Sequence, residues 1–215
     1  MTAAPMLSEL ERDALAELGN IGIGRASTAL GRMLGGLVTL SVPSVEMVPP
    51  DEVAGLLDRA LTPPLVGISE TLGGLFAGCA LLVFPQAGSL CLVRAALPSD
   101  VPAEDAPELE DEVLAELGNV VLNSALALVA NLLGEAVETG LPAVFRGGAA
   151  EILRGCSGAA PTADGAAVLF HIDLRTTLPG GDGAAVAGRV VLLLDAGSAG
   201  ALQATLGRYI GRLVA

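Results

Sequence analysis

The chain has 215 residues, a net charge of −13 and 52% hydrophobic residues. This is enough apolar material for a domain with a substantial core, and it excludes an intrinsically disordered protein. All 11 basic residues are arginines, which excludes a P-loop lysine, a Schiff-base lysine and a lysine general base, while the acidic balance argues against binding nucleic acid or an anionic membrane surface.

The first half of the chain opens with helical spacing over residues 7–34, in which Gly19 marks a place where the helix could break. A strand over residues 38–48 follows, and its Pro43 predicts an edge strand or a bulge. The patterns that come next predict a short helix, two strands and a further helix. These elements span residues 51–60, 65–71, 75–84 and 87–96.

The second half of the chain repeats the first. Residues 9–35 and 108–134 align without a gap and share the run LAELGN, and Pro43 corresponds to Pro142. The same order of elements then recurs, with the glycine-rich stretch 178–183 predicted to lengthen a hairpin loop.

Each copy supplies about three strands, so joining both copies in one sheet about a pseudo-two-fold axis would complete a core. We therefore predict a single domain over residues 1–215, built from repeats over about 1–98 and 99–215. Because helices and strands occur in runs joined by short turns, we expect an α+β fold, a two-layer helix/sheet domain with a largely antiparallel sheet.

The three cysteines and the one histidine show no pattern typical of catalysis or metal binding. Cys79, Cys91 and Cys156 lie in apolar stretches without a C-x-x-C pair, which predicts buried free thiols in a reducing cytoplasm and no metal site. His171 lies in a strand-like run and is expected to face solvent or a partner. No signal peptide or membrane span is predicted, because the most apolar segment, residues 120–133, is short and contains two asparagines.

The polar residues of the first repeated helix share one arc. At about 100° per residue, Asp13, Glu17 and Asn20 project from the same narrow sector. An apolar stripe beside this arc is expected to face the sheet, and it consists of Leu7, Leu10, Ala14, Leu18 and Ile21.

The second helix carries the same arc, with Glu112, Glu116 and Asn119. A carboxylate and a carboxamide one helical turn apart can reach the same external point. The structural alternative is that Gly19 ends one helix and Asn20 caps the next, and duplication would copy a cap as well as it copies a site. Spacing and composition leave both interpretations open.

These motifs resemble the signature of the CheC-type chemotaxis phosphatase family, which includes CheC, CheX and FliY. The first copy of the signature consists of Asp13, Glu17, Asn20 and Pro43. The second consists of Glu112, Glu116, Asn119 and Pro142, with Glu112 where the family has aspartate or serine. The resemblance covers nearly the whole chain, and its length and doubled motif are most similar to CheC.

The resemblance implies a cytoplasmic protein of two-component signalling that dephosphorylates the aspartyl phosphate of the response regulator CheY. Asn20 and Asn119 would orient the attacking water, and Glu17 and Glu116 would pair with a lysine of the regulator. No cofactor of its own is implied, because the regulator supplies Mg²⁺.

The other motif residues would have supporting roles. Asp13 and Glu112 would assist at the start of each arc, and Pro43 and Pro142 belong to the same signature. Glycines 19 and 118 would keep the helix surface low, so that loops of a partner can approach.

Two other functions compete with this interpretation. A non-catalytic module could bind CheY or the receptor deamidase CheD without hydrolysis, since the flagellar switch protein FliM resembles the family in its middle domain but lacks the phosphatase residues. CheD is also an expected partner of a phosphatase of this kind. An unrelated hydrolase would need a carboxylate pair, which the sequence does not identify.

Overall fold

The computed structural model describes residues 6–74, 76–97, 101–102, 104–133, 136–156, 165–177 and 184–214. The first half contains α1 (Glu9–Met33), β1 (Leu37–Val48), η1 (Pro50–Glu52), α2 (Val53–Ala60), β2 (Leu65–Gly74), β3 (Gly78–Pro85), η2 (Gln86–Gly88) and α3 (Ser89–Ala96). The second contains α4 (Glu110–Leu133), β4 (Val137–Thr139), β5 (Ala143–Gly147), α5 (Ala149–Gly155), β6 (Ala166–Thr177), β7 (Ala184–Leu194) and α6 (Ala196–Val214). The predicted hairpin insertion over residues 178–183 lies outside the described residues.

The strands form one antiparallel sheet in the order β1-β6-β7-β3-β2-β4, with β5 pairing beside β4 on β2. This confirms the α+β prediction. The two hairpins, β2–β3 and β6–β7, meet at the centre through the β3–β7 pair. The outer strands are exchanged, because β1 pairs with β6 of the second half while β4 and β5 pair with β2 of the first.

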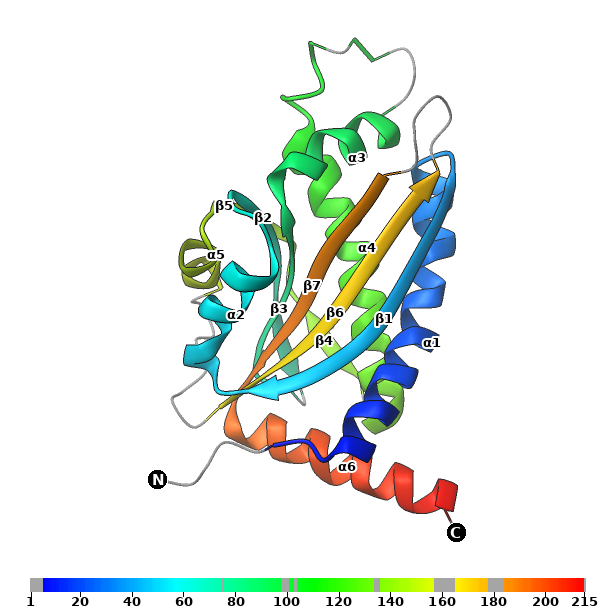
Figure 1. The fold of residues 1–215 in the computed structure, drawn as a ribbon, viewed down its shortest axis with the longest axis vertical. Helices are drawn as coiled ribbons and strands as arrows, with labels where there is room; N and C mark the ends of the chain where they lie inside the picture. The colour runs from blue at the N-terminus through cyan, green and yellow to red at the C-terminus, as the bar shows by residue number, and fades with distance from the viewer. Residues whose placement is uncertain are drawn as a thin grey trace.

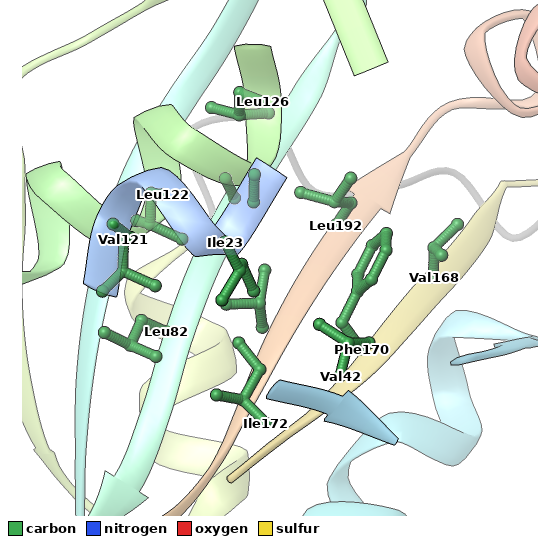
Figure 2. Packing of buried hydrophobic residues seen from close by; sticks show 14 of the residues in the cluster. Ile23, Val42, Leu82, Val121, Leu122, Leu126, Val168, Phe170, Ile172 and Leu192 are labelled. Carbon is green, nitrogen blue, oxygen red and sulfur yellow. The ribbon is translucent and has the colours of Figure 1, made fainter. Parts of the chain in front are cut away.

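Helices α1 and α4 lie side by side across one face of the sheet, and α6 crosses the ends of both (Figure 1). The main core lies between these helices and the sheet. Figure 2 shows Ile23 of α1, Leu122 of α4 and Phe170 of β6 within this core. A smaller core on the opposite face lies beneath α2 and α5. No helix of the described chain is both long and apolar enough to cross a membrane.

Helix α1 begins and ends with clear local signals. Ser8 and Glu11 form a capping box, in which the Glu11 backbone nitrogen donates to Ser8 Oγ at 3.3 Å and the Ser8 backbone nitrogen donates to Glu11 Oε2 at 2.8 Å. At the other end, Gly35 has a φ of +62°, a conformation that glycine adopts without strain and that ends helices. The helix is continuous through Gly19, so the possible break does not occur there, and the cap interpretation is wrong.

Pro43 predicted an edge strand or a bulge, and strand β1 has both features. It is an edge strand, and its register with β6 shifts between Ser41 and Ser44. Proline lacks the N–H that regular pairing requires, and a bulge on an edge strand accommodates it.

Cys79 and Cys156 are buried, as predicted, but the prediction that they are free thiols is wrong. Cys79 of β3 and Cys156, which follows α5, form a disulfide with Cα atoms 6.2 Å apart. The partners are 77 residues apart in sequence, and the contact arises only because α5 packs over the sheet. Cys91 lies in α3.

Candidate functional site

The two motif carboxylates of α1 and the two of α4 are available for contact with another molecule. Asp13, Glu17, Glu112 and Glu116 are all exposed. None forms a hydrogen bond or an ion pair within the part of the chain that the structure describes. The prediction that the arcs face solvent is therefore confirmed for these side chains, and the four carboxylates are free to meet cations on a partner.

The face of α1 that packs on the sheet differs from the predicted stripe. Leu10 and Ile21 were expected to face the sheet, but they are 57% and 58% exposed. The buried face is instead centred on small residues, and its members are Leu15, Leu18, Gly19, Gly22, Ile23, Ala26 and Leu30. A stripe judged by hydrophobicity undervalues glycine and alanine, which allow the helix to approach the sheet closely.

The glycines of both LAELGN runs face the sheet rather than a partner. A Cβ atom on Gly19 would lie 3.4 Å from the Phe170 ring, and one on Gly118 would lie within van der Waals overlap of Ile68. The expectation that these glycines lower the outer surface is wrong. Their physical role is close packing of α1 and α4 on strands β6 and β2.

Asn20 is half-buried, and its side chain joins α1 to strand β1. Its Oδ1 accepts a hydrogen bond from the backbone nitrogen of Val42 at 2.8 Å. Its Nδ2 donates to the carbonyls of Val42 and Ala16, both at 3.0 Å. Both donors of the carboxamide are therefore used, and the outer backbone groups of an edge strand are satisfied by a helix side chain.

Asn119 has a different environment at the corresponding place in α4. Its Oδ1 accepts a hydrogen bond from Nδ2 of Asn123, one turn further along the helix. Its own Nδ2 makes no hydrogen bond to the described residues. The only buried, unpartnered side-chain polar atoms of those residues are the two oxygens of Glu70, so the free nitrogen of Asn119 retains access to solvent.

The strand next to α4 explains this difference. Pro142 corresponds to Pro43, but it lies in a break between β4 and β5, whereas Pro43 lies within continuous β1. Leu141, which corresponds to Val42, is 92% exposed and outside any strand. The backbone that Asn20 binds in the first half is thus displaced in the second, and Asn119 has no strand to hold.

The start of α4 is fixed by charged contacts outside the motif. Arg146 of β5 lies 2.6 Å from Asp111 Oδ1 and 3.4 Å from Glu110 Oε2, and Ser89 of α3 donates to Glu110 at 2.8 Å. The hydrogen bond to Asp111 raises the pKa of the Arg146 guanidinium above its usual value. These contacts leave Glu112 and Glu116 on the open side of the helix.

The remaining candidate residues give little sign of catalysis. His171 lies in β6, as predicted, and its Nε2 is 2.5 Å from Glu46 Oε1 of β1. Within the described ranges, no group of three or more histidine, cysteine, aspartate or glutamate residues could hold a metal ion. The carboxylate and carboxamide groups of α1 and α4 remain the candidate site.

This fold, with two motif helices on one antiparallel sheet, is similar to that of CheC-like proteins. A family model described as CheC-like matches residues 10–47, which include nearly all of α1 and of β1. A solved structure of FliY from Thermotoga maritima has the same fold, with a TM-score of 0.70 and 18% identity over 94% of this chain and 98% of that one.

Two curated proteins of Bacillus subtilis are similar in sequence. The flagellar motor switch phosphatase FliY is 29% identical over 140 residues, which is 64% of this chain and 36% of FliY. The CheY-P phosphatase CheC is 27% identical over 129 residues, 59% of this chain and 61% of CheC. The matches span less than two thirds of either relative. The chain is similar in sequence to both CheC and FliY, and these matches do not separate the two.

Proposed function

We propose that this protein is a phosphatase that hydrolyses the aspartyl phosphate of a CheY-type chemotaxis response regulator. The observation that carries the proposal is the pair of exposed, unpartnered glutamates, each one turn before a motif asparagine on neighbouring helices α1 and α4. The names of the two Bacillus relatives support the reaction class, since both are phosphatases and one acts on CheY-P.

The chemistry required of the protein is modest. An aspartyl phosphate in a receiver pocket already has Mg²⁺ and a lysine from the regulator, so hydrolysis is limited by placing a water in line with phosphorus. A carboxamide offers both an acceptor and donors and does not titrate near neutral pH. Asn119 and Asn20 would orient this water, and the protein would need no cofactor of its own.

The glutamates would fix how the regulator docks. Glu17 and Glu116 are free to pair with a lysine of the regulator, one helical turn from the asparagine. Asp13 and Glu112 precede them by a further turn and add to the same acidic arc. Since charge pairs at the rim of an interface mainly affect association and orientation, we expect these residues to influence KM more than kcat.

The test is the decay of the phosphorylated regulator from the same organism, with Mg²⁺ present. We expect the wild-type protein to accelerate decay. The double variant Glu17→Ala with Glu116→Ala should need a much higher regulator concentration to reach half of its maximal rate. Glu104→Ala is the matched control, because Glu104 is exposed but outside both helices. If the wild type binds the regulator, or CheD, without accelerating decay, the non-catalytic binding module replaces the phosphatase.

A further inference from the structure

The two motif asparagines have unequal freedom to act on a partner. Asn20 uses Oδ1 and both Nδ2 hydrogens within the protein, in bonds of 2.8 to 3.0 Å. To reach a bound regulator, it would have to release the Val42 backbone in an edge strand. Asn119 has one intrahelical partner and a free amide nitrogen, so it can act without disturbing the sheet.

A second difference lies one turn further along each helix. Asn123 of α4 occupies the position that Gly24 occupies in α1. Its Nδ2 binds Asn119 Oδ1, which holds the Asn119 carboxamide in one orientation. Gly24 has no side chain that could bind Asn20, and the space beside it is open, because a Cβ atom there would meet nothing within 4 Å.

We infer that the two motif helices have different roles: Asn119, oriented by the positioning residue Asn123, acts on the water at the regulator's phosphate, whereas Asn20 chiefly closes the edge of the sheet. The inference rests on the proposed phosphatase function. It predicts that α4 carries most of the turnover and that α1 contributes most to the stability of strand β1.

The first experiment compares Asn119→Ala with Asn20→Ala in the full chain, by regulator dephosphorylation and by thermal unfolding. Asn119→Ala should lower kcat about 100-fold, the usual effect of removing one preorganised amide, and leave the melting temperature unchanged. Asn20→Ala should lower the melting temperature by several degrees, because two backbone groups of Val42 lose their partners. It should lose less than half of the activity per folded molecule.

Equal loss of about half the activity in both variants would overturn the inference while leaving the proposed phosphatase intact. An inactive wild type would overturn both. If Asn20→Ala fails to fold, Glu17→Ala and Glu116→Ala make the same comparison, since both glutamates are exposed and unpartnered. The inference then requires a larger loss of activity from Glu116→Ala.

The second experiment tests Asn123 as a positioning residue. Asn123→Ala should lower kcat and leave KM for the regulator unchanged, because the variant frees the Asn119 carboxamide but removes no docking charge. Asn131→Ala is the control, an exposed asparagine further along the same helix. A rise in KM with unchanged kcat, or equal effects of both variants, would show that Asn123 does not orient Asn119.

Discussion

The helix-covered face of the sheet has two halves, one beneath α1 and one beneath α4, and corresponding positions in them hold different side chains. Phe170 packs under Gly19 in the first half, and Ile68 packs under Gly118 in the second. Two residues further along the same face of each strand, the first half has Ile172 and the second has Glu70. An apolar core position in one half is therefore a carboxylate in the other.

The sheet edges next to these halves differ as well. Beneath α1 the edge strand is continuous, and Asn20 and Ser27 bind its outer backbone groups. Beneath α4 the edge is split into β4 and β5, and Leu126 stands where α1 has Ser27. A duplicated motif can thus keep its spacing while one copy becomes part of the framework and the other stays open.

Among variants that test this difference between the halves, those of Glu70 should change the free energy of unfolding most. Its carboxylate is fully buried without a hydrogen-bond partner among the described residues, and burial raises its pKa from 4.5 to about 7. Because the folded state holds this proton more tightly than the unfolded state, the free energy of unfolding falls as pH rises from 4.5 to about 7, and then levels off. Glu70→Ile, which copies Ile172, should stabilise the protein at pH 8 by on the order of 3 kcal/mol.

Urea unfolding at pH 5 and pH 8 measures this effect. The gain from Glu70→Ile should be greater at pH 8, and Glu70→Gln should remove the same pH dependence with a smaller gain, since its amide is still buried without partners. A pH-independent gain would show that ionisation of Glu70 does not destabilise the fold.

The two motif glycines form the next pair of variants. A Cβ atom at position 118 would lie 2.3 Å from Ile68 Cγ2 and 2.8 Å from Ile68 Cβ. Gly118→Ala should therefore destabilise the protein by about 2 kcal/mol through overpacking. Gly19→Ala meets only ordinary contacts with Phe170, and the higher helix propensity of alanine should make it neutral or slightly stabilising. Thermal unfolding measures both variants, and equal changes in melting temperature would contradict the difference in packing.

Replacing Ser27 should change the free energy of unfolding least. Its Oγ accepts a hydrogen bond from the Leu40 backbone nitrogen at 2.9 Å. Ser27→Ala should cost about 1 kcal/mol, because one edge-strand amide loses its partner. Hydrogen exchange at Leu40 should accelerate in this variant, with Ser124→Ala in α4 as the control, since Ser124 bonds only within its own helix. Unchanged exchange at Leu40 would show that Ser27 does not protect the edge.

Local sequence signals predicted most of the fold. The helical spacing identified α1 to within two residues at each end, and Pro43 correctly predicted an edge strand or a bulge. Those features depend on neighbours in sequence, on period and on the missing proline N–H, which a single chain displays directly. The exposed arc of glutamates was likewise predicted from helical geometry.

Features that depend on distant residues were not predictable. The side of α1 that meets the sheet is set by Gly19, Gly22 and Ala26, whose small size matters only once a strand lies beneath them. The bonds of Asn20 to Val42 required knowing that β1 passes beside the helix rather than away from it. The Cys79–Cys156 disulfide likewise depends on how α5 packs over the sheet.

The exchange of outer strands sets the order in which this chain can fold during synthesis. Among the described strands, β1 pairs with β6 alone, so residues 37–48 have no sheet partner until residues 166–177 have emerged from the ribosome. Such distant pairing slows folding, because a long loop must close before its contacts form. The first 97 residues contain a complete motif helix and β1 but not β6, which packs under Gly19 and joins β1 to the other strands, so the first-half site is complete only after most of the second half has been synthesised.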